Sequence, residues 1–281
     1  MEVKKNSLFM YVLVSIFVFT LCIGETKAAN YENYFGIEMT NQEYNNLLNL
    51  GFSEDEIYYM DTDTFENNKD TSSNLVATNE KYYKTIYTGL DGTSYSTEIT
   101  EDEYNNQGLI APAGTVTTEY KRMVSTMSQT SSGFRYKVTV GWLNMPSVRS
   151  YDIIGVGFDD DIYISSSVYF SYTHCNSSGD CTTASDYYFR QKTSTGGSIA
   201  YKFPSGDVTS MTAVLYYDVA KNTSSTITEL NMCGDYAHAT TNVSYSTYSN
   251  HRITINGLEL GSNASYYDAI PCAISTWYGS W

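Results

Sequence analysis

The stretch YKVTVGW at residues 136–142 alternates between apolar side chains and polar or small ones. Its two faces hold different sets: Tyr136, Val138 and Val140 on one, and Lys137, Thr139 and Gly141 on the other. A period of two is typical of a strand with one buried face. The stretch therefore predicts a strand of an antiparallel sheet whose polar face meets water.

Strand-like runs continue on both sides of this stretch. YDIIGVGF at residues 151–158 is more continuously apolar, which predicts a strand in the middle of a sheet. KYYKTIYT and TSYSTEIT flank GLDG at residues 89–92, whose Asp91-Gly92 pair is typical of a hairpin turn. The predicted fold class is mainly β: an antiparallel β-sandwich or jelly-roll-like domain preceded by a small N-terminal helical segment.

The helical segment is predicted from repeated start signals between residues 31 and 70. Ser, Thr or Asp is followed three positions later by Glu in three places: Thr40 with Glu43, Ser53 with Glu56, and Asp63 with Glu66. This spacing is that of a capping box, and Gly51 suits the position after a helix end. We expect three short helices that pack around six side chains: Leu47, Leu50, Phe52, Ile57, Met60 and Phe65. The motif MTNQEYNN at 39–46 recurs as ITEDEYNN at 99–106, which predicts one more helical turn or two.

The N-terminus has the layout of a secretory signal. Lys4 and Lys5 precede an uncharged apolar run at 7–24, and the polar, small-residue stretch ETKAA follows. An uncleaved anchor is the alternative, because 18 residues approach the length that spans a bilayer. We predict a secreted protein that begins at Ala29 or Asn30 after cleavage. Its predicted parts are a signal peptide (1–28), a helical segment (29–70), a polar linker with the first strands (71–130) and a disulfide-containing β-sandwich (131–281).

The chain is strongly acidic, with a formal net charge of −15. Loss of residues 1–28 removes three Lys and two Glu, so the predicted mature chain carries −16. Such a surface repels phosphate groups, whose binding depends on Lys and Arg. We therefore expect no nucleic-acid partner and no membrane insertion after signal cleavage.

Four cysteines follow the predicted signal. Cys175 and Cys181 bracket the turn-forming NSSGD between two strand-like runs, which predicts a disulfide across the mouth of a hairpin. This pairing leaves Cys233 with Cys272. A metal site of the four thiols is disfavoured, because C-x-x-C pairs and ligand-spaced histidines are absent. We predict no metal and no cofactor.

No residue is assigned a catalytic role. The three histidines, His174, His238 and His251, belong to no nucleophile elbow or H-E-x-x-H motif, and the chain has no Gly-rich phosphate loop. A His and an Asp brought together by folding remain an alternative, because catalytic triads are defined in space. The run Asp159, Asp160 and Asp161 either forms a solvated turn or offers oxygen ligands to calcium.

Aromatic residues are the most unusual feature of the composition, with 28 tyrosines. Trp277, Tyr278 and Trp281 cluster at the C-terminus, and alternation in CAISTW puts Trp277 on the face opposite Cys272. If a disulfide turns Cys272 inward, the three aromatic side chains form an exposed binding patch. The competing arrangement is a tail that folds back and buries both tryptophans.

WLNMPSVRSYDIIGVGFD at 142–159 and YNNLLNLGFSEDEI at 44–57 resemble a group of uncharacterised secreted proteins of Gram-positive bacteria. The resemblance implies export and a cell-envelope setting, and it carries over no site residue. The absence of catalytic motifs and the tyrosine content predict an extracellular or cell-envelope binding module for carbohydrate or protein. The alternatives are a secreted hydrolase with a His/Asp site and a membrane-active β toxin, the latter suggested by the alternation in ISSSVYFSYTH at 164–174.

Overall fold

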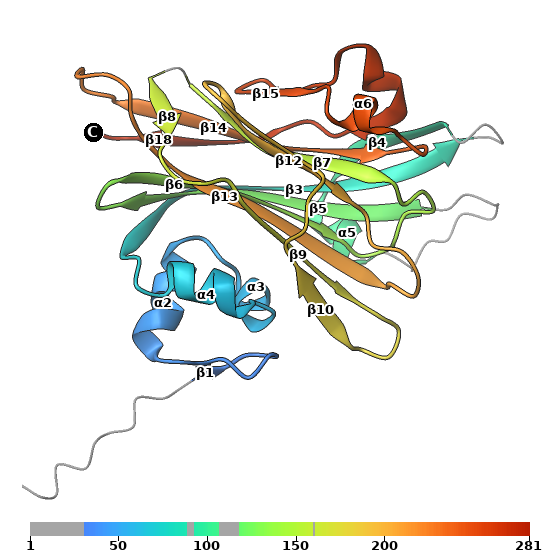
Figure 1. Cartoon of the computed structure of the whole chain (residues 1–281), viewed down its shortest axis with the longest axis horizontal. Coiled ribbons are helices and arrows are strands. Elements are labelled where there is room, and N and C mark those ends of the chain that lie inside the picture. Colours follow the sequence, from blue (N-terminus) through green and yellow to red (C-terminus); the bar gives the residue numbers. More distant parts are fainter. Residues whose placement is uncertain (1–30, 89–92, 107–117, 160) are drawn as a thin grey trace, which may run out of the picture.

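The structure is a computed structural model that describes residues 31–88, 93–106, 118–159 and 161–281. The predicted signal peptide, the GLDG turn and Asp160 lie outside the described residues. As predicted, the chain forms a mainly β, antiparallel sandwich preceded by a small helical segment (Figure 1). Within the described ranges, no helix has the length and apolarity needed to span a bilayer.

The first sheet has eight strands in the order β10-β9-β13-β6-β5-β3-β4, with β8 also paired to β13. Its strands are β3 (Ser73–Thr88), β4 (Thr93–Ile99), β5 (Thr118–Thr130), β6 (Gly133–Trp142), β8 (Ile162–Ile164), β9 (Tyr169–Cys175), β10 (Cys181–Ala184) and β13 (Ser210–Lys221). The predicted hairpin around GLDG is confirmed, because β3 and β4 pair with Thr88 opposite Thr93.

The second sheet has six strands in the order β11-β12-β7-β14-β17, with β18 also paired to β14. Its strands are β7 (Tyr151–Phe158), β11 (Phe189–Thr193), β12 (Gly196–Lys202), β14 (Glu229–Ala239), β17 (Tyr267–Ala269) and β18 (Ala273–Tyr278). The central position predicted for YDIIGVGF is confirmed, because β7 lies between β12 and β14. Two short pairs complete the strands: β1 (Tyr31–Glu32) with β2 (Glu38–Met39), and β15 (Arg252–Thr254) with β16 (Gly257–Glu259).

The helices lie on the two outer sides of the sandwich. α2 (Asn41–Asn49), α3 (Glu54–Tyr58) and α4 (Thr62–Asn68) form a helical layer against the first sheet, and α6 (Tyr245–Tyr248) lies over the second sheet (Figure 1). The remaining helices are α5 (Glu101–Asn105) and the 3₁₀ helix η1 (Gly261–Tyr266). All six side chains predicted to form the helical core are buried together, with Val214 and Tyr216 of β13 beneath them.

The start signals of the helices are mostly as predicted. Complete capping boxes begin α2 at Thr40 and α3 at Ser53, and Thr100 caps α5 in the repeated motif. Gly51 has a φ of 85°, the left-handed conformation that ends a helix. The predicted cap of the third helix is wrong: α4 begins two residues earlier, because Asp61 accepts the amide hydrogen of Thr64 at 2.7 Å.

Strand β6 differs from its prediction on one face. Tyr136, Val138 and Val140 point into the core between the sheets, as the alternation indicates. The other face does not meet water, because Lys137 is 1% exposed beneath the helical layer. The helical layer therefore covers the polar face of β6, and this face is buried in a second interface.

Candidate functional site

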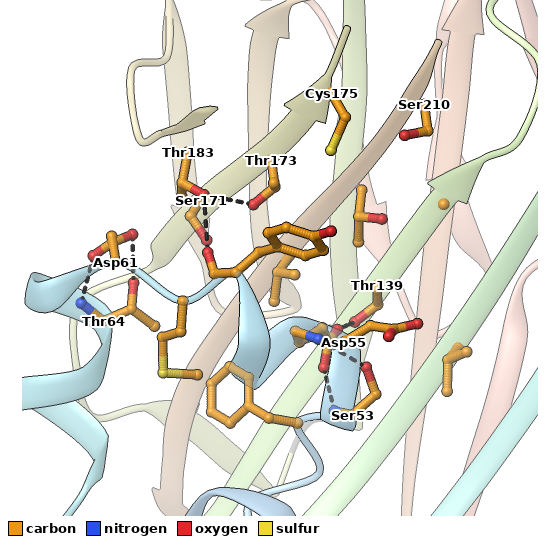
Figure 2. Close-up of a pocket in the computed structure, with 18 of the residues that line it drawn as sticks. Ser53, Asp55, Asp61, Thr64, Thr139, Ser171, Thr173, Cys175, Thr183 and Ser210 are labelled. Atoms are coloured by element: carbon orange, nitrogen blue, oxygen red, sulfur yellow. Dashed lines mark hydrogen bonds between the residues drawn. The ribbon is translucent and has the colours of Figure 1, made fainter. Parts of the chain in front are cut away.

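A cleft of about 340 Å³ opens between the helical layer and the outer face of the first sheet. We call it the helix–sheet cleft. Residues 52–64 form its helical side, and alternate residues of β6, β9, β13 and β10 form its floor. Figure 2 shows Ser171, Thr173 and Ser210 on the strands, with Asp55 and Asp61 on the helical side.

The floor of the helix–sheet cleft is rich in hydroxyl groups. Strand register places Thr173 of β9 opposite Thr212 of β13, and Cys175 opposite Ser210. Because alternate side chains of a strand share a face, Ser171 and Thr173 point to the same side. Thr173 is hydrogen-bonded to Thr183 at 2.7 Å. Among the described residues, the hydroxyls of Ser171, Ser210 and Thr212 have no hydrogen-bond partner, so they are available to a ligand.

The helical side contributes an aromatic ring and a carboxylate. The Tyr59 ring lies 4.8 Å from that of Tyr58 and 5.3 Å from that of Tyr34, measured between centroids. Burial, followed by the neighbouring Tyr58 and Asp55, raises the pKa of Tyr59, so its hydroxyl stays protonated and can donate a hydrogen bond. Within the described part of the chain, neither this hydroxyl nor the Asp55 carboxylate has a hydrogen-bond partner.

A buried ion pair fixes the helical side to the floor. Lys137 Nζ lies 2.7 Å from Oε2 and 2.9 Å from Oε1 of Glu56. Thr139 accepts from Lys137 and donates to Glu56, while Glu56 also accepts the amide hydrogen of Ser53 at 2.7 Å. Burial lowers the pKa of Lys137, and Glu56 opposes this shift. The Glu56 carboxylate therefore joins α3 to the floor of the cleft, and its oxygens are occupied by these contacts.

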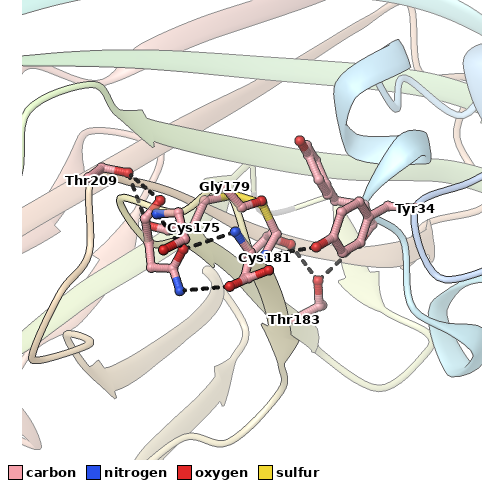
Figure 3. The surroundings of a disulfide bond; sticks show 11 residues. Tyr34, Cys175, Gly179, Cys181, Thr183 and Thr209 are labelled. Carbon is pink, nitrogen blue, oxygen red and sulfur yellow. Dashed lines mark hydrogen bonds between the residues drawn. A yellow bond between two sulfur atoms is a disulfide. The ribbon is translucent and has the colours of Figure 1, made fainter.

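A disulfide forms one wall of the helix–sheet cleft. Cys175 and Cys181 are bonded across the β9–β10 hairpin, as predicted (Figure 3). Cys181 donates its amide hydrogen to the Tyr34 hydroxyl at 3.2 Å, and the Thr183 hydroxyl donates to the Tyr59 carbonyl at 2.9 Å. The bridged hairpin is thus tied directly to the helical layer.

The other two cysteines are held as neighbouring thiols. Cys233 is buried in β14, Cys272 precedes β18, and a hydrogen bond joins their side chains. That hydrogen bond, together with burial, raises the pKa of Cys233. The bridge between them stays a prediction.

The structure corrects the predicted orientation of the C-terminal aromatics. Trp277 is only 9% exposed, and its ring centroid lies 4.9 Å from that of Phe134. The Trp281 ring packs on the same phenylalanine at 5.0 Å, so Tyr278 alone is exposed. The tail closes the sandwich, and the expected patch of Trp277, Tyr278 and Trp281 is not formed.

None of the three histidines lines the helix–sheet cleft, although His174 lies on β9 between two residues that do. His238 Nδ1 is 3.0 Å from both carboxylate oxygens of Asp152, and both side chains are fully buried. His251 Nε2 contacts the Ser198 hydroxyl at 2.8 Å, with its Nδ1 on the Tyr248 carbonyl. Burial lowers the pKa of His251 and of His174. The pairing of His238 with Asp152 could not be predicted from local sequence signals, because the two residues lie on neighbouring strands far apart in the chain.

The aspartates that follow β7 have a structural partner. Asp159 accepts hydrogen bonds from the backbone and the side chain of Asn231, at 3.0 and 3.2 Å. Asp161 is exposed. Among the described residues, no group of three His, Cys, Asp or Glu side chains is placed to hold a metal ion.

Apart from Cys175, which was predicted as a disulfide partner, the residues of the helix–sheet cleft were not among the predicted site residues. Alternation in ISSSVYFSYTH already groups Ser171 and Thr173 on one face. The strand that pairs with it, β13, lies some forty residues further along the chain, and the helical side lies about a hundred residues earlier. Only the tertiary fold brings the three together.

Comparisons with known proteins find only weak similarity. No protein-family model matches the chain, and no curated protein matches it. Among solved structures, the collagen-binding domain of the Erysipelothrix rhusiopathiae surface protein RspB matches 57% of this chain with 7% sequence identity and a TM-score of 0.26. The match spans 65% of that chain, less than two thirds of its length.

Proposed function

We propose that the protein is an extracellular or cell-envelope binding module whose helix–sheet cleft takes a carbohydrate. The observation that carries this proposal is the set of unpaired polar groups in the cleft. Ser171, Ser210 and Thr212 project from the floor toward the side that holds Tyr59 and Asp55. The signal-like N-terminus, the Cys175–Cys181 disulfide and the resemblance to secreted proteins support the extracellular setting.

The chemistry of the helix–sheet cleft suits a sugar. A hydroxyl group both donates and accepts, so three unpaired hydroxyls match the mixed donors and acceptors around a sugar ring. The Asp55 carboxylate only accepts hydrogen bonds, and the Tyr59 ring offers an apolar surface beside a donor. An unpaired carboxylate also disfavours an anionic ligand, so we expect an uncharged sugar in the cleft.

The proposal is tested on the purified protein with an array of neutral oligosaccharides, followed by calorimetric titration of the sugars that bind. Thr212→Val keeps the side-chain shape and removes one hydroxyl, and Tyr59→Phe removes another. Each variant should weaken binding about fivefold, because one hydrogen bond contributes roughly 1 kcal/mol.

Thr182→Val is the matched control, because Thr182 is exposed one residue along β10 and points to the face opposite Thr183. Its affinity should equal that of the wild type. Thermal unfolding shows whether each variant keeps its fold. Full affinity in both cleft variants, or an array on which no sugar binds, would count against the proposal.

A further inference from the structure

A second pocket, of about 280 Å³, lies beside the helical layer. Three tyrosines and three carboxylates line it: Tyr31 and Glu32 of β1, Tyr44 of α2, and Glu54, Asp55 and Tyr58 of α3. We call it the tyrosine–carboxylate pocket. Figure 1 places β1 on the side of the helices that faces away from the two sheets. Asp55 is the one residue that lines both this pocket and the helix–sheet cleft, so the two sites are separate.

The aromatic rings of the tyrosine–carboxylate pocket are held by their neighbours. Tyr31 stacks on Tyr44 with ring centroids 4.0 Å apart and planes at 11°. Tyr58 packs edge-on against Tyr59 at 4.8 Å and against Tyr34 at 6.0 Å, measured between centroids. Tyr31 and Tyr58 are nevertheless 44% and 47% exposed. The pocket therefore presents two fixed aromatic surfaces to a ligand, and the face of a tyrosine ring attracts cations.

The charges that line the pocket are all negative. Glu32, Glu54 and Asp55 are exposed, and none of them forms an ion pair within the described part of the chain. No Lys, Arg or His of the described residues lines the pocket. Glu54 lies one helical turn before Tyr58 on α3. Burial first, and then the charge of Glu54, raise the pKa of Tyr44, so Glu54 also lies near the second aromatic surface.

This arrangement favours an organic cation over a metal ion. Among the residues that the structure describes, no three His, Cys, Asp or Glu side chains are placed to hold a metal ion. Carboxylates spread around a pocket still attract a larger cation, because Coulomb attraction does not require direct coordination. A quaternary ammonium group suits such a pocket best. It has no N–H group that needs an acceptor, and its charged methyl groups pack on aromatic faces.

We propose that the tyrosine–carboxylate pocket binds a quaternary ammonium group of the choline type. The rings of Tyr31 and Tyr58 contact its methyl groups, and Glu54 supplies opposite charge beside both rings. This ligand class differs from the uncharged sugar proposed for the helix–sheet cleft. The two proposals therefore stand or fall separately.

The test titrates the purified protein by calorimetry with choline and two matched probes. The first, 3,3-dimethylbutan-1-ol, has the shape of choline without its charge, and the second, ethanolamine, has the charge without the methyl groups. Choline should bind, and added salt should weaken its binding. The uncharged probe should bind at least about tenfold more weakly, because it loses both the cation–π and the Coulomb attraction. Ethanolamine should bind at least about fivefold more weakly, because no methyl groups are buried against the rings.

Variants of the protein test the ring and the carboxylate separately. Tyr58→Leu removes the ring and should weaken choline binding about fivefold, whereas Tyr58→Phe keeps the ring and should bind like the wild type. Glu54→Gln should weaken choline binding about threefold. Neither residue lines the helix–sheet cleft, so binding of sugars there should stay unchanged in all three variants.

Matched controls separate the pocket from general effects of charge or aromatic content. Tyr163→Leu removes an equally exposed tyrosine from β8 of the first sheet. Asp63→Asn removes an exposed acid from the first turn of α4, as Glu54→Gln does from the first turn of α3. Both controls should bind choline like the wild type, and thermal unfolding shows whether each variant keeps its fold. The proposal is overturned if choline does not bind, if either matched probe binds as well as choline, or if a folded Tyr58→Leu/Glu54→Gln variant keeps full affinity.

Discussion

Asp235 is a carboxyl group enclosed in the second sheet. It accepts the amide hydrogens of Leu258 and Tyr236, both at 2.6 Å, and its side chain adjoins Gly257. Burial raises the pKa of Asp235 from an ordinary 3.8 to about 7, even though the two backbone hydrogen bonds act in the opposite direction. The folded protein therefore holds a proton that the unfolded chain releases.

This proton makes stability depend on pH in a defined direction. Between about pH 4 and pH 7 the unfolded chain loses the Asp235 proton and the folded protein keeps it, so the free energy of unfolding falls as pH rises. The full effect is at most about 4 kcal/mol. Urea denaturation of the wild type and of Asp235→Asn across this range measures it. The variant should show a less negative slope against pH, and parallel curves would contradict the assignment.

Strand β18 joins β14 at the position of the two thiols. Cys233 lies opposite Ile274 in the register of β14 with β18, and Cys272 precedes β18 by one residue. A bridge would close a loop of about 40 residues, against about 7 for Cys175–Cys181. In the chain-entropy model the larger loop contributes about 4 kcal/mol and the smaller about 2.4 kcal/mol.

We predict that the oxidised protein contains a Cys233–Cys272 disulfide in addition to the Cys175–Cys181 disulfide. Peptide mapping without reduction should recover the linked peptides. In that protein, Cys272→Ser should lower the free energy of unfolding more than Cys181→Ser. Recovery of both residues as alkylated thiols after oxidative refolding would refute the pairing.

Much of the element structure could be predicted from local signals. Alternation in YKVTVGW and YDIIGVGF indicated strands, and the spacing of Ser53 and Glu56 indicated a helix start, because such signals depend on residues close in sequence. Alternation also grouped Trp277 correctly with Ala273 and Ser275. It could not say which group faces inward. That depends on Phe134, a residue of the other sheet.

At the scale of the whole molecule, the helical layer is seated on the first sheet by charge as well as by apolar packing. The side chains of Lys137 and Glu56 are 2% and 6% exposed, so both charges are desolvated. Removing one partner of such a pair leaves the other buried and unpaired, which costs several kcal/mol. The floor of the helix–sheet cleft depends on the same contact, because Thr139 bonds both partners.

Lys137→Met should therefore lower the free energy of unfolding by about 3 kcal/mol, measured by chemical denaturation. Lys137→Met with Glu56→Gln should recover most of that loss, because no unpaired charge remains. Lys84→Met is the control, since Lys84 and Glu103 form an exposed pair worth at most about 1 kcal/mol. A single variant as stable as the wild type would show that the ion pair does not secure the helical layer.

The last strand of the sandwich is bound to the first ones. Asn79 of β3 donates to the Ile274 carbonyl at 2.6 Å, and Ser125 of β5 donates to the Ala273 carbonyl at 2.8 Å. Tyr83 reaches the Pro271 carbonyl at 2.7 Å. The ribosome makes β3 and β5 well before β18, the strand whose backbone they contact. These hydrogen bonds between the first and second sheets can therefore form only after residues 271–274 have been translated.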